Sequence, residues 1–318
     1  MRAICATESR SICPIVIDMS HPLRVWTPDD ADYPYRLQSC SDKPNPLYVR
    51  GNVPPEGGHV VAIVGTRRPT ERGKELTETL VRELHERLDD VIIVSGGAYG
   101  IDIAAHRAAL KYGVPTIMVL AHGLDRIYPS QHRPEAEAAM ENGGVMSEYE
   151  VGTEPFAGNF LQRNRIIAGL ADAVVIVESR ERGGSLNTAQ RALKYDRALF
   201  AFPGRPNDIS SRGCNDLIRR GFAQLIDGAD DLIRAMGWKT KQEKSGGIQT
   251  SLIGLMDDLS ETQQALLTKL ETAEEGLHIN VLVQETGKDY GEVSSELTML
   301  ELDGLVRSLP GGIYRFVR

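Results

Sequence analysis

Between about residues 58 and 236 the chain alternates short apolar runs with segments of helical spacing. The runs include Val60–Val64, Val91–Val94 and Ala173–Val177, and no polar residue interrupts them. Such a run indicates a strand that is buried on both faces, because a half-exposed strand would alternate apolar and polar residues. Helices between successive strands are typical of parallel pairing, since the chain must cross back before each new strand. The pattern predicts an α/β fold with a Rossmann-like, doubly wound and mainly parallel sheet.

Helical periodicity is clearest at Glu71–Leu88, where leucines recur every four residues from Leu76 to Leu88. The remaining elements follow the same alternation. Further strands are expected at Thr116–Leu120, Gly144–Met146 and Ala198–Phe202, and further helices at Ile101–Tyr112, Gln131–Glu141, Arg163–Leu170, Leu186–Tyr195, Leu217–Arg220 and Ala229–Ala235.

The C-terminal sixty residues predict a different module. Trp238–Thr250 is polar and contains glycine, as linkers do. Ser260 is a candidate helix cap, and two further helices are expected at Ile279–Glu285 and Tyr290–Leu302. Val306–Leu309 and Ile313–Val317 flank a Pro-Gly-Gly turn and predict a hairpin, so the whole resembles a winged helix. The expected division is an N-terminal extension over 1–57, a Rossmann-like domain over 58–236, a linker over 237–256 and a winged-helix domain over 257–318.

Composition narrows the class of protein. No apolar run approaches the roughly 20 residues of a membrane helix, and the N-terminus lacks the apolar stretch of a secretory signal, which favours a cytoplasmic protein. The four cysteines show no metal-type spacing and are expected to be reduced thiols. Net charge is −8, but residues 257–318 carry five basic against twelve acidic side chains, whereas residues 59–236 carry 22 against 24. Because most of the net negative charge lies in residues 257–318, the central domain can still carry a basic groove.

Glycines and arginines gather where the predicted strands end. Gly65-Thr66-Arg67 and Ser95-Gly96-Gly97 follow two strands, Arg182-Gly183-Gly184-Ser185 follows a third, and Arg163-Asn164-Arg165 is expected to open a helix. Open α/β sheets bind ligands at this edge, because helix N-termini and exposed amides offer donors to anions. The first loop is neither a Walker A sequence nor a GxGxxG fingerprint. Together the loops predict an extended phosphate-binding surface, with a nucleotide pocket as the alternative.

The motifs of the central domain resemble the DNA-processing protein A (DprA/Smf) family in order and spacing. They are DADYPYRLQ, KPNPLYVRGN, VAIVGTRRPTERG, SGGAYGIDIAAHRAAL, GLDRIYPSQH, MSEY, FLQRNRIIAGLADAVVIVE, GGSLNTAQRAL and AFPGRPND with GCNDLIRRGF. The resemblance implies a non-enzymatic, homodimeric binder of single-stranded DNA. In natural transformation such proteins protect incoming DNA, counter single-strand-binding protein and load RecA recombinase. No cofactor and no metal are implied.

The resemblance also carries over a set of DNA-binding residues. They are Gly65, Thr66 and Arg67, then Ser95, Gly96 and Gly97, then Arg163, Asn164 and Arg165, and finally Ser185, Thr188 and Asn215. Arginines and backbone amides pair with phosphates without reading bases, as binding without sequence preference requires. One position departs from the family. Ser130 stands after Tyr128-Pro129 where relatives often have a basic residue, and His132 and Arg133 are the candidates to replace it.

Two alternatives remain open. Phosphoribohydrolases with a Rossmann-like fold carry a glycine-rich loop followed by a catalytic glutamate, but Gln190 stands in the comparable stretch here and cannot act as a carboxylate base. Asp102 and His106 are four residues apart and resemble an acid–base pair, although bracing of the glycine loop explains Asp102 more simply.

In the winged helix, the segment after Asp289 carries Glu292, Glu296 and Glu301 and no cation, which favours a protein contact over duplex DNA.

Overall fold

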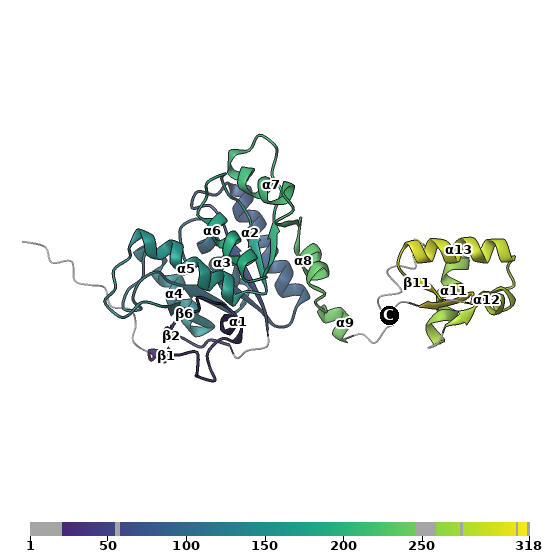
Figure 1. The fold of residues 1–318 in the computed structure, drawn as a ribbon, viewed down its shortest axis with the longest axis horizontal. Helices are drawn as coiled ribbons and strands as arrows, with labels where there is room; N and C mark the ends of the chain where they lie inside the picture. The colour runs from purple at the N-terminus through teal and green to yellow at the C-terminus, as the bar shows by residue number, and fades with distance from the viewer. Residues whose placement is uncertain (1–20, 55–57, 246–258, 274–275, 310, 317–318) are drawn as a thin grey trace, which may run out of the picture. The chain divides into compact units, whose positions relative to one another are not determined.

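The computed structural model describes residues 21–54, 58–245, 259–273, 276–309 and 311–316 (Figure 1). The chain forms two compact units that divide between Lys241 and Gln242. The boundaries expected from the sequence at residues 57, 236 and 256 stay predictions, and Cys5 and Cys13 lie outside the described residues.

The first unit contains a nine-stranded sheet in the order β1-β2-β6-β5-β4-β3-β7-β8-β9. Neighbours from β6 to β9 pair in parallel, while β1 and β2 add an antiparallel edge. The predicted fold class, a Rossmann-like, doubly wound and mainly parallel sheet, is confirmed. The strands are β1 (Arg24–Trp26), β2 (Leu47–Arg50), β3 (His59–Val64), β4 (Val91–Ser95), β5 (Thr116–Val119), β6 (Gly143–Ser147), β7 (Ala173–Ile176), β8 (Ala198–Ala201) and β9 (Gln224–Leu225).

Helices link the parallel strands. They are α1 (Tyr35–Gln38), α2 (Glu71–Arg87), α3 (Ile101–Lys111), α4 (Arg133–Glu141), α5 (Ala157–Leu170), α6 (Ser185–Lys194), α7 (Arg212–Arg219), α8 (Ala229–Met236) and α9 (Lys241–Ser245), with 3-10 turns η1 (Ser130–His132) and η2 (Ile209–Ser211). Helix α9 falls within the stretch that the sequence analysis assigned to a linker.

Helix α5 corrects one prediction. It begins at Ala157, so Arg163-Asn164-Arg165 lies inside the helix and does not open it. The first turns were missed because Gly158 and Asn159 have low helix propensity. In the structure, the Asn159 side chain donates a hydrogen bond to the carbonyl oxygen of Ala121 at 3.3 Å.

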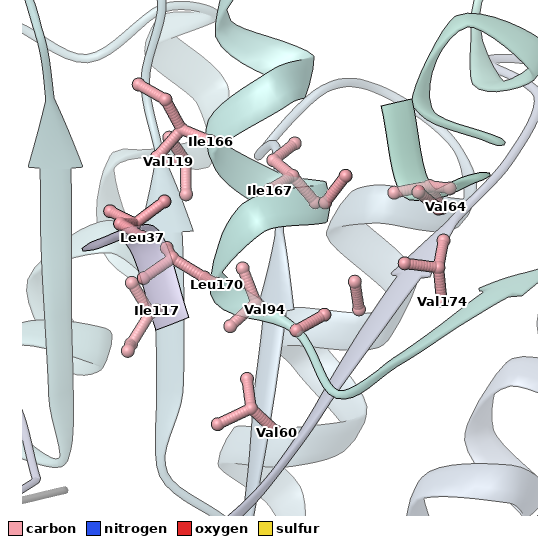
Figure 2. Close-up of a cluster of buried hydrophobic side chains, with 14 of the residues drawn as sticks. Leu37, Val60, Val64, Val94, Ile117, Val119, Ile166, Ile167, Leu170 and Val174 are labelled. Atoms are coloured by element: carbon pink, nitrogen blue, oxygen red, sulfur yellow. The ribbon is translucent and has the colours of Figure 1, made fainter. Parts of the chain in front are cut away.

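Successive side chains along the central strands point alternately into two hydrophobic cores, one on each face of the sheet. Val60, Ala62 and Val64 of β3 face a cluster that includes α5 and α6, while Val61 and Ile63 face a cluster that includes α2, α3 and α8. Figure 2 shows Ile166, Ile167 and Leu170 of α5 against the first face. Covering helices on both faces explain why the strands read as unbroken apolar runs.

The direction in which successive strands are added to the sheet reverses between β3 and β7. From β3 the strands proceed outward through β4, β5 and β6, and the chain then returns to place β7 on the other side of β3. The loops that leave β3 and β7 therefore diverge to opposite sides of the sheet. A ligand crevice is expected at the carboxyl ends of these two strands.

The second unit is a small domain with its own core. It contains α11 (Glu261–Thr272), β10 (Leu277–His278), α12 (Ile279–Thr286), α13 (Tyr290–Leu302), β11 (Val306–Leu309) and β12 (Ile313–Phe316), and β10 pairs with β12 to give a three-stranded sheet. Ser260 caps α11 in a capping box with Gln263, as its position predicts. No helix among the described residues of either unit is long and apolar enough to cross a membrane.

Candidate nucleic-acid interface

A cavity of about 340 Å³ lies at the point where β3 and β7 diverge. Its walls come from the loop after β3, the start of α3, the middle of α5 and the loop after β7, so three of the four predicted segments contribute to it, whereas Ser95-Gly96-Gly97 does not. We call it the switch-point groove. It is lined by Val64, Gly65, Thr66, Arg67, Ala98, Asp102, Phe160, Leu161, Arg163, Asn164, Arg180, Arg182, Gly183, Gly184, Ser185 and Thr188.

The loop after β3 presents a free cation. Gly65 lets α3 approach closely, because a Cβ there would lie 2.6 Å from Cγ1 of Ile101. Thr66 closes the turn by accepting a hydrogen bond from the amide of Arg68 at 3.2 Å. The exposed Arg67 guanidinium lies 5.4 Å from the centre of the Phe160 ring and has no ion pair with any described residue. Arg67 therefore has its five N–H donors available to an anion.

Arg163 occupies a different environment. Its side chain is 3% exposed, and its Nη1 donates to the carbonyl oxygen of Gly96 at 2.5 Å and to that of Val119. Burial lowers the pKa of Arg163 to about 10, and the nearby Asp102 carboxylate opposes that shift. In this arrangement the guanidinium ties the ends of β4 and β5 together.

Asp102 lines the groove from the first turn of α3. It is buried, and it accepts hydrogen bonds from the backbone amides of Gly65, Ala98 and Gly96. Burial raises the pKa of Asp102 to about 6, against the opposing effects of Arg163 and those amides. The role of Asp102 as a brace of the glycine loop is the one that the geometry supports. The attraction of the groove for anions therefore comes from its arginine side chains.

Arg165 also has an internal partner. Its Nη2 lies 2.5 Å from Oε2 of Glu148, and both side chains are largely buried. Glu178 has another role, since its carboxylate accepts hydrogen bonds from the amide and hydroxyl of Thr70, the residue that caps α2. Both glutamates hold the loops in place.

Four further predicted residues act within the protein. Ser95 is buried and donates its hydroxyl to the carbonyl of Ile63 at 2.6 Å, while Gly97 has φ +65° beside Met118. Asn215 makes two 3.0 Å hydrogen bonds with the backbone of Gly204. Ser185 lines the groove, but its hydroxyl donates to that of Ser179 at 2.9 Å.

The structure therefore separates the predicted set into two groups. Those that line the groove are Gly65, Thr66, Arg67, Arg163, Asn164, Ser185 and Thr188, and those that do not are Ser95, Gly96, Gly97, Arg165 and Asn215. Direct phosphate contact stays a prediction for all of them. Arg67 is the member whose charge is both exposed and unpaired.

The candidates to replace the basic residue at Ser130 are otherwise engaged. His132 is buried with Nδ1 2.8 Å from the carbonyl oxygen of Gly97, and Arg133 pairs with Glu137 at 2.6 Å. Neither presents a free cation, so the structure does not support this replacement.

Sequence motifs pointed to Arg67 and Arg182, but they did not point to the other unpaired arginines around them. Within residues 21–54 and 58–238, seven arginine side chains have neither a hydrogen bond nor an ion pair. All remaining arginine and lysine side chains in these ranges have at least one. The exceptions all lie in or beside the loops that follow β3, β7 and β8, and each is exposed. Their position after predicted strands was the available signal. They are Arg67, Arg68, Arg72, Arg180, Arg182, Arg205 and Arg212.

Aromatic rings accompany the groove. Tyr128 and Phe160 have ring centres 6.0 Å apart, and Tyr128 is 51% exposed. Phe156, at the start of α5, is 68% exposed. Tyr33 is buried and donates to the carbonyl of Pro44, which excludes it from stacking on a base in this structure. Rings beside a free cation suit a ligand that has both bases and phosphates.

Comparisons with protein families give two matches. Residues 24–237 match the model of DNA recombination-mediator protein A, and residues 256–312 match the DprA winged helix domain.

Individual relatives agree with these matches. The chain is 35% identical to Protein Smf of Synechocystis sp. over 91% of its own length and 79% of the relative. It is 39% identical to the DNA processing protein DprA of Streptococcus pneumoniae over 64% of its own length and 71% of the relative.

Two solved structures resemble the fold. DNA processing protein A of Streptococcus pneumoniae superposes with a TM-score of 0.62 and 37% identity, covering 67% of this chain and 74% of that one. DNA processing protein A of Helicobacter pylori, described with a single-stranded DNA binding mode, gives a TM-score of 0.59 and 36% identity, covering 68% of this chain and 96% of that one.

Proposed function

Because the chain belongs to the DNA recombination-mediator protein A family, we propose that it binds single-stranded DNA in the switch-point groove and loads RecA recombinase onto that DNA. The similarity to the Helicobacter pylori protein, whose single-stranded DNA binding mode has been described, supports this ligand. The proposed role is that of a carrier without catalytic activity.

The observation that carries the proposal is the convergence of three free arginines. Arg67, Arg180 and Arg182 line one groove, and none has an ion pair with a described residue. Unpaired exposed cations attract a polyanion and release its counterions, which supplies most of the free energy of binding without sequence preference. The groove lies at the reversal point of a doubly wound sheet, the usual location for a ligand in this architecture.

The aromatic rings favour single-stranded over duplex DNA. Phe156, Phe160 and Tyr128 offer flat surfaces, and only unpaired bases can leave the helical stack to lie against them. Every base has such a face, so stacking is compatible with binding that ignores sequence.

Partners follow from the same proposal. The family role includes a homodimer, RecA and competition with single-strand-binding protein during natural transformation. The acidic helix α13 fits a protein contact, because Glu292, Glu296 and Glu301 lie on it and it carries no lysine or arginine. In this proposal the winged-helix domain contacts a protein partner or regulates the first unit, and the first unit binds DNA.

Fluorescence anisotropy with labelled oligothymidylate and with duplex DNA tests the DNA-binding proposal. We expect tighter binding to the single strand and a loss of about tenfold for Arg67→Ala, equivalent to about 1.4 kcal/mol. Arg82→Ala is the matched control, since it removes an exposed arginine that pairs with Glu86 on the surface of α2. If both variants bind the single strand with equal affinity, Arg67 is not part of the DNA-binding surface.

Loading is tested separately from binding. RecA filament assembly on DNA coated with single-strand-binding protein should be faster with the wild-type chain than without it. Arg67→Ala should lose this effect in proportion to its loss of DNA affinity. Normal binding without any stimulation would leave the DNA-binding proposal standing and reject the RecA role.

A further inference from the structure

Four of the unpaired arginines do not line the switch-point groove, namely Arg68, which directly follows Arg67, and three arginines farther along the chain. Arg72 is in the first turn of α2, Arg205 is in the loop after β8, and Arg212 is the first residue of α7. All three side chains are exposed, and none pairs with a residue that the structure describes. We refer to Arg72, Arg205 and Arg212 as the β8-side surface.

This surface is joined to the groove by backbone contact. The amide of Gly213 donates to the carbonyl of Ser179 at 2.8 Å, and a Cβ on Gly213 would lie 2.6 Å from the carbonyl oxygen of Arg180. Arg180 lines the groove, and Arg212 directly precedes Gly213. The N-terminus of α7 therefore lies against the wall of the groove.

A second cavity underlies the surface. It has a volume of about 330 Å³ and lies between the first turn of α2 and the loop after β8. Arg72 lines one side, while Asn207, Ser210 and Ser211 offer polar groups from the other. Two carboxylates are also present, Asp208 and the buried Glu178 that Thr70 holds. Of the three arginines, Arg72 lines this cavity, while Arg205 and Arg212 stand in the sequence on either side of its lining segment 207–211.

The other side of the groove differs in its electrostatics. A cavity of about 610 Å³ on that side is lined by Arg67, which also lines the groove, and by three further cations, Lys74, Arg107 and Lys111. Each of these three further cations already has an acidic partner, in Glu71, Glu135 and Glu78 respectively. A phosphate there would have to compete with a carboxylate and would meet its repulsion. The two sides of the groove are therefore not equivalent for a polyanion.

We propose that a single strand held in the switch-point groove continues over the β8-side surface, where Arg72, Arg205 and Arg212 bind its backbone as a second, sequence-independent phosphate site. The inference rests on the proposed function and adds the direction in which the strand leaves the groove. Longer single strands gain contacts that short ones cannot make.

Oligonucleotide length separates the two sites. We choose oligothymidylates of about 6 and about 25 nucleotides, because single-strand binders built on OB-folds cover about 4–16 nucleotides per site. The test variant combines Arg72→Gln, Arg205→Gln and Arg212→Gln. The control variant combines Arg82→Gln, Arg87→Gln and Arg234→Gln, which removes the same charge from arginines paired with Glu86, Asp230 and Asp231. Thermal unfolding of both variants verifies that the fold is retained.

We expect the test variant to bind the long strand at least tenfold more weakly than the control variant. Its salt slope on the long strand should fall by about two, since each phosphate contact contributes about 0.7. Affinity for the short strand should match that of the control.

Equal binding of the long strand by both variants would overturn the second site. Equal losses on short and long strands would overturn it as well, because the arginines would then act on the groove itself. If the wild-type chain binds neither oligonucleotide, the proposed function fails, and that outcome is distinct from a failure of the second site alone.

Discussion

The guanidinium of Arg163 donates a hydrogen bond to the carbonyl oxygen of Gly96, with 2.5 Å between Nη1 and the oxygen. Both residues belong to motifs that the sequence resemblance assigns to DNA binding, yet here they bind each other inside the protein. Arg67, from the neighbouring loop, is exposed and has no ion pair within the part of the chain that the structure describes. Two arginines that look equivalent in the sequence thus have opposite environments.

Substitution should separate their roles. Arg163→Ala leaves the Gly96 and Val119 carbonyls without their buried donor and removes the partner charge of Asp102, so we expect a loss of about 3 kcal/mol in unfolding free energy. Arg67→Ala should change it by less than about 0.5 kcal/mol. Urea unfolding followed by circular dichroism measures both. An Arg163→Ala variant as stable as Arg67→Ala would contradict the structural role.

The pair of Arg165 and Glu148 predicts strong coupling. Arg165→Met leaves a buried carboxylate unpaired and should destabilise the protein by about 3 kcal/mol. Glu148→Gln combined with Arg165→Met should recover a large part of that loss, because no isolated charge remains buried. A double-mutant cycle by urea unfolding gives the coupling energy, and a value near zero would show that the pair is not formed in solution.

Asp102 predicts a pH dependence of stability. Burial raises its pKa from 3.8 to about 6, so between these values the folded state binds this proton more tightly than the unfolded state. The unfolding free energy contributed by Asp102 therefore falls as pH rises from about 4 to about 6, by at most about 3 kcal/mol, and is level above.

Asp102→Asn removes that dependence. Urea unfolding of wild type and variant at pH 4.5 and pH 7.5 should show the wild type losing stability relative to the variant at the higher pH. The comparison cancels other groups such as His106, whose pKa burial lowers to about 3. A stability difference that does not change with pH would mean that Asp102 titrates normally.

Because helix α13 of the winged-helix domain is acidic, we predict that this domain contributes little to DNA binding. Deletion of residues 257–318 should leave the affinity for single-stranded DNA within about twofold, because Glu292, Glu296 and Glu301 would repel phosphates at α13. Gel shifts with single-stranded and duplex DNA measure this. A clear loss of either form of binding on deletion would assign a DNA contact to this domain.

Sequence reasoning predicted the parallel sheet because buried strands leave unbroken apolar runs, as at Val60–Val64. It missed β1 and β2, which have only three and four residues and which begin and end, respectively, with an arginine, Arg24 and Arg50. Within the site, the motif positions predicted Arg67 and Arg163 alike. Which of them is buried depends on where α5 begins and which way each side chain points, and neither is encoded in a short motif.

The most direct test of the groove is the salt dependence of single-stranded DNA binding by a variant with Arg67→Gln, Arg180→Gln and Arg182→Gln. The account predicts that the slope of log affinity against log salt concentration becomes shallower by about two, at about 0.7 for each lost phosphate contact. The fold should be retained, since none of the three side chains has an ion pair among the described residues. A slope equal to that of the wild type would contradict the account.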